Sequence, residues 1–562
     1  MNNLKQKFIN SAILMIGASL LVKIISAVYK IPLTAYIGAT GRGYFNMAYN
    51  LYMPFHALIM GAFPVALTHL VSKYREQGNG AKVYSLKKAS SSLFFFIGLS
   101  AMLIMLLLAK PYCSIVSSSY KSLLCIYALA PTVLFSAMAS AKRGFAEGHL
   151  NMVPTAAGQV IEALFKMVFG LLFAKSAMGF LYNEYLEGST VLGSICTDEA
   201  EALSNIYPIT AAAAVCGVTV GAFFSYTYTA SYVSLKYNSH TPLGNYKKRD
   251  SAKEILSFSA PIIISMLIQS LSEFFDNSSV QYCLSLCSVE RLQAAFAQCF
   301  EINNTAGEDT VTYIYGLFSA AHDLRNLIPG LTMAVGVTAV PVLSAAFENK
   351  DKERFSSLAN SIFKYTSVIA FAGGFGLSLT AKSVLEILYG SSNYDIVIGC
   401  LNLVSFYGFT MILYSLSGVA VFSVQAIGCA SKGIPSFVVS AVIRVVLNYI
   451  LVSKTELNIM GAAVSDAVSY VIVLASNLYI FSKYSGIKYD VNKMIIKPLL
   501  CGVGAYFLSL ITYNALFSFE NCFAELAVSG GIYCFIVTLL LVLSKTVEFS
   551  ELKFLQYCKK TA

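Results

Sequence analysis

The sequence has few charged residues and no tryptophan. Asp, Glu, Lys and Arg make up only 12% of its 562 residues, about half of their share in a soluble globular protein. In contrast, 57% of the residues are hydrophobic, and the mean hydropathy is +0.67. This shortage of charge excludes a soluble globular chain and predicts a protein that crosses a membrane many times. Because tryptophan is absent, the 35 tyrosines must supply any aromatic belt at the membrane interface.

Several motifs of enzymatic and metal chemistry are also missing. The 13 cysteines include no Cys-x-x-Cys pair, and the 5 histidines have neither metal-ligand nor catalytic spacing. Cys283 and Cys287 are close enough in sequence to pair or to remain free. No GxxxxGK[ST] loop is present, so we do not expect the chain to bind ATP in the usual way. The sequence therefore predicts no metal, no cofactor and no catalytic residue.

Apolar runs long enough to cross a bilayer, about 20 residues each, recur along the whole chain. They predict an all-α polytopic membrane protein with about 14 transmembrane helices. The first run has no small-x-small cleavage site before Lys23, so we expect it to be retained as a helix. The expected spans are 9–29, 44–72, 91–109, 121–141, 154–174, 207–233, 255–280, 313–343, 364–381, 396–428, 435–453, 459–482, 495–515 and 524–543.

Basic residues are concentrated in the loops on one side of these spans. By count, about 27 Lys and Arg residues lie on the side of the N-terminus and about 8 on the other side. This bias predicts an even number of spans with both termini in the cytoplasm. The long loops 175–206 and 281–310 lean acidic and are expected outside. The net charge of +10 then belongs mostly to the cytoplasmic face and requires no nucleic-acid partner.

The chain also contains an internal repeat. The segments that start at Gly43 and Tyr315 are both long helices with a late proline, followed by a short charged loop. A glycine, a polar turn and a proline recur at 148–154 and 428–435, where the prolines are expected to open a helix because the first turn does not need their missing N–H.

The repeat predicts four parts: an N-terminal lobe of six spans (1–235), an inter-lobe loop (236–254), a C-terminal lobe of six spans (255–482), and two further helices with a cytoplasmic tail (483–562). Both lobes start on the same side of the membrane. The lobes should therefore be related by a pseudo-two-fold axis along the membrane normal. In transporters built from repeats the binding site lies between the halves.

A small set of charged residues lies inside the apolar spans. A charge facing lipid at mid-bilayer costs at least ~2.5–3.5 kcal/mol, so we expect these side chains to face a water-filled cavity or one another. Two of them, Glu273 and Asp276, are close enough to an outer end to be solvated. The full set is Lys23, Lys166, Arg325 and Arg444, with Glu162, Glu273, Asp276, Asp323 and Asp466.

These in-span residues leave alternatives open. Glu162 and Lys166, four residues apart, form either a structural pair or part of a cavity. Arg444 has no acidic residue within one helical turn, which favours a cavity, whereas Lys23 could snorkel outward. Buried cations suit an anionic substrate, because Arg offers a fork of donors to phosphate oxygens and Lys a movable charge.

The acidic residues have two possible roles in the same spans. They either pair with the cations or bind a coupling H⁺ or Na⁺. Asp323 and Asp466 are the candidates for ion coupling.

Three stretches resemble motifs of a known family. RGFAEGHLNMVPTAAGQVIEALFK (143–166), VKIISAVYKIPLTAYIGATGRGYFNMAYNLY (22–52) and GAFPVALTHLVSKYREQG (61–78) resemble the stage V sporulation protein B family of polysaccharide exporters. That family belongs to the multidrug/oligosaccharidyl-lipid/polysaccharide exporter superfamily, together with the lipid II flippases. The sequence departs from the family pattern at Phe145, where Tyr is usual, and near Ala146 and Ala163, where Gln is usual.

The resemblance implies a flippase of the bacterial cytoplasmic membrane. Its substrate would be an undecaprenyl-pyrophosphate-linked saccharide, first of all the peptidoglycan precursor lipid II, moved from the inner to the outer leaflet by alternating access. Such a protein would act in cell-wall synthesis or sporulation. It is expected to be a monomer, with a cell-wall synthase as a candidate partner. Four candidate substrate-binding residues fall on motif positions that are charged in the family: Lys23, Arg143, Glu162 and Lys166. Two further candidates, Arg325 and Arg444, are added here because they are cations inside the spans.

Two other functions compete with this one. A multidrug or cation antiporter of the same superfamily would need a carboxylate-lined pocket and few buried cations. A membrane-embedded glycosyltransferase would need an acid/base constellation, for which the outer segment 182–207 offers carboxylates but no basic or metal-binding partner. Its carboxylates are Glu184, Glu187, Asp198, Glu199 and Glu201.

Overall fold

The computed structural model describes residues 2–117, 119–237, 247–303, 309–390, 392–487, 490–516 and 521–546. Nearly all of them are helical, which confirms the predicted all-α polytopic fold. The strands of the described ranges form one small antiparallel hairpin, β1 (Thr190–Val191) with β2 (Ser194–Ile195).

The chain divides into two compact units. The first comprises Met1–Gln293 and Asn303–Gly316, and the second Ala294–Ile302 and Leu317–Ala562. Each unit is described by itself. The lobe boundaries expected from the repeat stay a prediction.

The first unit is built from seven long helices and three short helical turns among its described residues. The turns are η1 (Leu58–Ala62), η2 (Cys113–Ser117) and η3 (Tyr120–Ser122). The long helices are α1 (Asn2–Ala57), α2 (Phe63–Glu76), α3 (Gly80–Tyr112), α4 (Leu123–Glu147), α5 (Val153–Gly188), α6 (Glu199–Lys236) and α7 (Lys248–Ser285).

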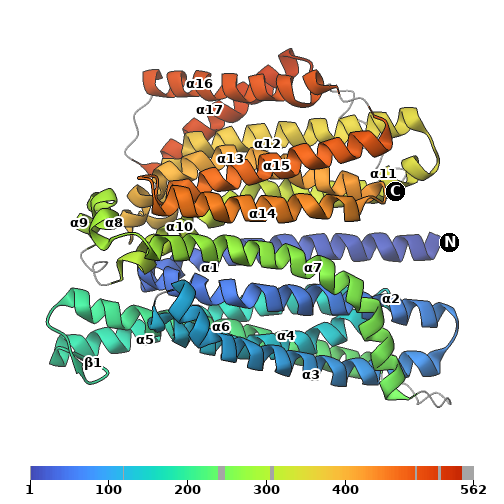
Figure 1. The fold of residues 1–562 in the computed structure, drawn as a ribbon, viewed down its shortest axis with the longest axis horizontal. Coiled ribbons are helices and arrows are strands. Elements are labelled where there is room, and N and C mark those ends of the chain that lie inside the picture. The colour runs from blue at the N-terminus through green and yellow to red at the C-terminus, as the bar shows by residue number, and fades with distance from the viewer. Residues whose placement is uncertain are drawn as a thin grey trace. The chain divides into compact units, whose positions relative to one another are not determined.

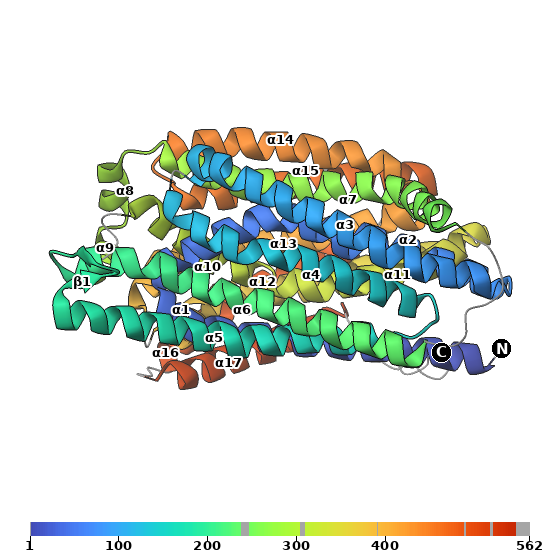
Figure 2. The ribbon, with the colours of Figure 1, turned by 90° about the horizontal axis from the view of Figure 1, so that it is seen from below.

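Helix α1 contains a break at Gly38. The φ of this residue is 61°, in the left-handed region that glycine adopts without steric cost. The chain reverses direction there, so that α1 supplies the first predicted span and part of the second (Figure 1, Figure 2). Further along the unit, Pro154 stands in the first turn of α5, as predicted.

The second unit contains α11 (Leu327–Glu348), α12 (Lys352–Tyr389), α13 (Tyr394–Ala426), α14 (Ala430–Ser453), α15 (Ile459–Ser485), the turn η5 (Asn492–Ile496), α16 (Lys497–Leu516) and α17 (Cys522–Leu543). Two short helices, α8 (Val289–Ala295) and α9 (Ala297–Ile302), follow α7 along the chain, and α10 (Thr310–Arg325) precedes α11.

The packing inside the two units supports the predicted repeat. In the first unit α3 packs on α4, α4 on α6, and α5 on α6. The second unit has the same neighbours in the same order, because α12 packs on α13, α13 on α15, and α14 on α15. The last two helices, α16 and α17, pack on each other and along α12 (Figure 1). The hydroxyl of Tyr533 on α17 donates to the carbonyl of Ala372 on α12 at 2.9 Å.

One detail of the repeat was predicted wrongly. Helix α14 begins at Ala430, so Pro435 lies inside the helix and does not open it. The reason is the turn at Gly428, whose φ of 72° ends α13 and lets a new helical turn start at once. That turn is closed by Lys432, whose N–H donates to the carbonyl of Cys429 at 3.0 Å.

Each predicted span coincides with a helix or with consecutive helices. Among the described residues, 11 helices are long and apolar enough to cross a membrane, or up to 12 when the bent α7 is included. The smaller number has two causes. Gly17–Glu76, counted once, contains two predicted spans, and the predicted span 313–343 is divided between α10 and α11.

The loop expected at 175–206 is largely helical, which corrects the prediction. Helix α5 runs to Gly188, and α6 already begins at Glu199. The start of α6 is fixed by Asp198, whose side chain accepts a hydrogen bond from the N–H of Glu201 at 2.7 Å. Such a cap satisfies one of the free donors at a helix N-terminus. The loop expected at 281–310 likewise contains the end of α7 and the short helices α8 and α9.

Candidate functional site

Arg143, which is buried, and Glu162, which is half-buried, form an ion pair in the first unit. Nη2 of Arg143 on α4 lies 3.2 Å from Oε2 of Glu162 on α5 and donates to Oγ of Ser225 on α6 at 2.6 Å. Ser225 in turn donates to the carbonyl of Gly158 on α5 at 2.8 Å. These bonds join three helices at one guanidinium, which is only 3% exposed.

The guanidinium of Arg143 has two N–H-bearing nitrogens that make no hydrogen bond with a described residue. Its Nε and Nη1 atoms are buried and have no hydrogen-bond partner among the residues that the structure describes. Arg carries five N–H donors, and buried polar groups are nearly always hydrogen-bonded. The remaining donors of Arg143 are therefore suited to the oxygens of an anionic ligand.

Lys166 lies on α5 one helical turn after Glu162 and contacts α1. Its ammonium donates to the hydroxyl of Tyr49 at 3.1 Å and stands 5.2 Å and 5.5 Å from the ring centroids of Tyr49 and Tyr29. His56, also on α1, lies in the electrostatic field of Glu162, Arg143 and Lys166. The two charges of α5 thus have partners on α4 and α1, beyond the pair within one helix that their spacing suggested. We refer to Arg143, Glu162 and Lys166 as the first cluster.

Lys23 is not part of this cluster. It is exposed on α1 and makes no hydrogen bond or ion pair with any described residue. Its exposure agrees with a side chain that extends away from the helix core, and its role in substrate binding stays a prediction.

A second cluster surrounds Asp466 in the second unit. Arg325 on α10 and Arg444 on α14 both pair with this carboxylate on α15, and the Nε of Arg444 lies 3.5 Å from Oδ1. Arg444 also donates to Ser469 at 2.7 Å. All three charged residues are buried, with exposures of 2% for Asp466, 6% for Arg325 and 8% for Arg444. We refer to these three residues as the second cluster.

The surroundings of Arg444 differ from the prediction. The sequence showed no acidic residue within one turn of it, which is correct for α14 itself. Its acidic partner, Asp466, comes from the neighbouring helix α15. Contacts between helices are not visible in the spacing along one helix, and the packing of α14 on α15 creates this one.

Tyrosines line the second cluster, and the sequence did not identify them. Tyr470 stacks on Tyr414 with centroids 4.6 Å apart, and the guanidinium of Arg444 lies 5.3 Å from the ring centroid of Tyr470. Arg325 lies 5.8 Å from the same ring. Aromatic faces attract cations. The one available signal was the position of Tyr470 four residues after Asp466, on the same face of a helix.

The remaining acidic candidates lie outside the two clusters as defined. Asp323 is half-buried on α10, two residues before Arg325. On α7, Glu273 is exposed, but Asp276 is only 8% exposed, so the expectation that Asp276 is solvated is wrong. Helix α7 packs on α1 and α3, and such contacts between helices are not visible in the sequence.

Cys283 and Cys287 are both free and buried. Within the described ranges no group of three or more His, Cys, Asp and Glu residues is placed to hold a metal ion.

The two clusters share one composition. Each contains two cations and one carboxylate, so each has a formal charge of +1 when all its groups are ionised. An ion pair alone would be neutral. The excess of positive charge makes both clusters suited to anions.

Comparisons with known proteins identify relatives of this chain. Residues 8–195 match the family model described as polysaccharide biosynthesis protein. The chain is 24% identical to the lipid II flippase MurJ of Bacillus subtilis (strain 168) over 481 residues, which cover 84% of this chain and 81% of that protein. It is 22% identical to stage V sporulation protein B of the same organism over 557 residues, 98% of each.

Solved structures share the fold. The structure of the lipid II flippase MurJ in an inward closed conformation matches with a TM-score of 0.65 at 14% identity, over 94% of this chain and 99% of that one. An inward-facing multidrug resistance MATE family transporter matches with a TM-score of 0.60 at 16% identity, over 82% of this chain and 98% of that one.

The likeness in sequence extends over most of the chain, and the likeness in fold covers nearly all of it. Together with the apolar helices, this likeness supports a multi-pass membrane protein. Residues 8–195 thus resemble the polysaccharide biosynthesis protein family, and most of the chain is similar in sequence to stage V sporulation protein B and to the lipid II flippase MurJ of Bacillus subtilis (strain 168).

Proposed function

We propose that this protein is a flippase that carries an undecaprenyl-pyrophosphate-linked saccharide, with lipid II as the first candidate, from the inner to the outer leaflet by alternating access. The relatives named as lipid II flippase and stage V sporulation protein B support this substrate class. The proposal places both termini in the cytoplasm of a bacterial cell and the protein beside the synthases of the cell wall.

The proposal depends on two donors of the Arg143 guanidinium, Nε and Nη1, that have no hydrogen-bond partner among the described residues. A pyrophosphate cannot cross about 30 Å of hydrocarbon without replacing its hydration. Buried Nε and Nη1 donors without a described partner offer charge-assisted hydrogen bonds to phosphate oxygens. Lys166, whose ammonium is held against two tyrosines, supplies a second positive charge. Arg325 and Arg444 would supply the corresponding charges in the second cluster.

Ion coupling is the second part of the proposal. Asp466 lies between two arginines, and its protonation would change the charge of that cluster by one unit. Asp323 is the other candidate. Outward movement of an anion from a negative cytoplasm is favoured by about 2.3 kcal/mol per charge per 100 mV, so a membrane potential can also drive transport.

A multidrug antiporter is the alternative that the MATE-like fold allows. A carboxylate that binds a cationic drug must not be neutralised by the protein itself. Glu162 pairs with Arg143, and Asp466 pairs with two arginines. This pairing favours an anionic substrate over a cationic one.

The glycosyltransferase alternative depended on the acidic residues of 182–207, several of which have structural contacts. Asp198 caps α6, Glu201 accepts from the backbone and hydroxyl of Thr197, and Glu199 accepts from Tyr182. Contacts of this kind fix a turn and need no catalytic explanation.

Transport of lipid II into the outer leaflet tests the proposed function. Proteoliposomes that contain this protein alone, loaded with labelled lipid II, are assayed for label that becomes accessible on the opposite leaflet. We expect wild-type protein to move lipid II and Arg143→Gln to lower the rate at least tenfold, because one lost charge-assisted contact is worth about 1.5–3 kcal/mol.

Lys382→Gln is the matched control for this experiment, because Lys382 is an exposed cation on a membrane helix outside both clusters. It should transport at the wild-type rate. Wild-type protein that moves no lipid II, or an Arg143→Gln variant that moves it at full rate, contradicts the proposal. Uptake of a cationic dye in place of lipid II would favour the multidrug alternative.

A further inference from the structure

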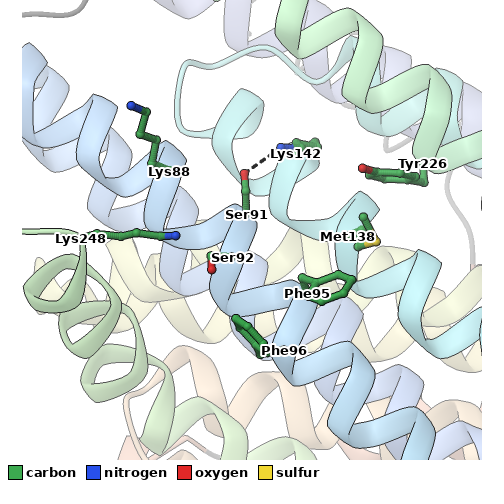
Figure 3. A pocket seen from close by; sticks show the side chains of 9 residues that line it. All are labelled: Lys88, Ser91, Ser92, Phe95, Phe96, Met138, Lys142, Tyr226 and Lys248. Carbon is green, nitrogen blue, oxygen red and sulfur yellow. Dashed lines mark hydrogen bonds between the residues drawn. The ribbon is translucent and has the colours of Figure 1, made fainter.

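A cationic cavity that the proposed transport cycle does not use lies at one end of the first unit. Its volume is about 430 Å³, within the range of about 300–1,000 Å³ of small-molecule sites. Four helices contribute to its walls, α3, α4, α6 and α7 (Figure 3).

Three lysines from three helices line this cavity. Lys88 comes from α3, Lys142 from α4 and Lys248 from α7, and Lys142 donates to Oγ of Ser91 at 2.7 Å (Figure 3). The described lining contains no carboxylate, and none of the three lysines forms an ion pair with a described residue. The sequence 238–246 that precedes Lys248 has no Asp or Glu either. The three positive charges therefore lack a neutralising partner within the described protein.

Two hydroxyls add donors to the same cavity. The side chains of Ser92 and Tyr226 make no hydrogen bond with any described residue. Ammonium and hydroxyl donors from different helices around one space are suited to the several oxygens of a phosphate.

The other wall of the cavity is apolar and continues along α3. Phe95, Phe96 and Met138 form this wall. From Ser92 the same face of α3 continues through Phe96 to Leu103 and Leu107, at helical spacing. Phe96 is 61% exposed, Leu103 49% and Leu107 76%. A cationic pocket is thus followed by an exposed apolar strip on one membrane helix.

We propose that this cavity binds the phosphate headgroup of an anionic membrane phospholipid, with one acyl chain along Phe96, Leu103 and Leu107 of α3. The lysines neutralise the phosphate, the hydroxyls bind its oxygens, and the apolar strip of α3 contacts the acyl chain. Basic pockets between membrane helices recognise anionic headgroups in this way. The lipid is a bound component of the membrane and not the transported substrate, so the inference goes beyond the proposed function.

Binding of phosphatidylglycerol and phosphatidylcholine to the purified full-length protein, measured by native mass spectrometry, tests this site. We expect wild-type protein to prefer phosphatidylglycerol. Replacing one lysine by Gln should weaken this binding about fivefold, and the triple variant Lys88→Gln, Lys142→Gln, Lys248→Gln should weaken it on the order of 100-fold.

A matched triple control removes the same amount of charge outside the cavity. Lys236, Lys253 and Lys432 are exposed lysines that do not line it, and their Gln variants should bind phosphatidylglycerol as the wild type does. Equal binding by the cavity variant and the control, or equal affinity of wild-type protein for the two lipids, would overturn the assignment.

A further arm distinguishes a lipid from free phosphate. The double variant Phe96→Gln, Leu103→Gln should weaken the binding of phosphatidylglycerol and leave the weak binding of glycerol phosphate unchanged. If inorganic phosphate binds wild-type protein as tightly as phosphatidylglycerol does, the site is a phosphate site without a lipid. Arg143→Gln should retain phosphatidylglycerol, so failure of lipid II transport and failure of this site are separate results.

Discussion

At the scale of single residues, the second cluster is held together by one shared carboxylate. Asp466 accepts a hydrogen bond from Arg325 on α10, forms an ion pair with Arg444 on α14, and is itself only 2% exposed. Removing one partner of a buried charged group leaves the others uncompensated, at a cost of about 3–5 kcal/mol. Asp466 is therefore expected to stabilise the fold, whatever part it has in coupling.

Asp466→Asn tests these two roles together. We expect a clear fall in the thermal unfolding temperature of the purified protein, because two buried guanidinium groups lose their counter-charge. Asp490→Asn is the control, since Asp490 forms an exposed pair with Lys493, and exposed pairs contribute only about 0–1 kcal/mol. An Asp466→Asn variant of unchanged stability whose transport no longer responds to a pH gradient would instead assign Asp466 to ion coupling alone.

The sequence identified the charged residues of both clusters but not their partners. Lys166, Arg325 and Arg444 were found because a charge inside an apolar run is costly, whereas Arg143 was found only through its motif. Ser225 and Tyr470 carry no such signal, because hydroxyl and aromatic residues are common in membrane helices. Their roles depend on which helices pack together.

At the scale of helices, a close approach of α5 and α6 positions the first cluster. Helix α6 carries Gly217 and Gly221 four residues apart, the small-xxx-small spacing that lets membrane helices touch. A Cβ atom on Gly221 would lie 2.6 Å from the carbonyl oxygen of Glu162 and 3.1 Å from the backbone N of Lys166. Glycine at 221 thus permits the approach that brings Ser225 within reach of Arg143.

Replacement of Gly221 by Val should separate these two helices. We expect a destabilisation of about 1–3 kcal/mol, the usual cost of overpacking, and a loss of lipid II transport because Arg143 loses its position. Thermal unfolding and the leaflet assay measure the two effects.

Gly179→Val is the control for this substitution. Gly179 lies on α5, and a Cβ atom added to it would have no neighbouring atom within 4 Å, so the same change in residue type should have little effect there. Equal behaviour of the two variants would mean that the contact at Gly221 does not set the position of α5.

Helix positions were largely predictable, whereas helix ends were not. Apolar runs of bilayer length are a strong signal, and each predicted span coincides with helix. The extension of α5 to Gly188 and the start of α14 at Ala430 lie in polar sequence, where hydropathy gives no information. Local hydrogen bonds decide such ends, as the cap at Asp198 does for the start of α6.

At the scale of the whole molecule, orientation in the membrane rests on the distribution of basic loops. The positive-inside rule assigns the β1–β2 hairpin to the outside and the turn before α12 to the cytoplasm. Leu192 in the hairpin is 65% exposed, and Lys352 at the start of α12 is exposed as well. Both positions are accessible to a reagent from whichever side they face.

Cysteine labelling measures this orientation. In a background that carries Cys534→Ser, because Cys534 is exposed, we expect a membrane-impermeant maleimide to label Leu192→Cys in intact cells and Lys352→Cys only after lysis. The parent without an added cysteine serves as the blank. The opposite labelling pattern would place the termini outside and contradict the proposed direction of transport.

The break at Gly38 has a practical consequence for anyone who modifies this protein. A single left-handed residue turns the chain back on itself, and a side chain at that position would press against the ring of Tyr207 at 3.3 Å. An epitope or fluorophore inserted at Gly38 would have no free space, because it would collide with Tyr207. The tight turn at Gly193 has the same handedness, but open space surrounds it, which makes it the natural attachment point for a reporter.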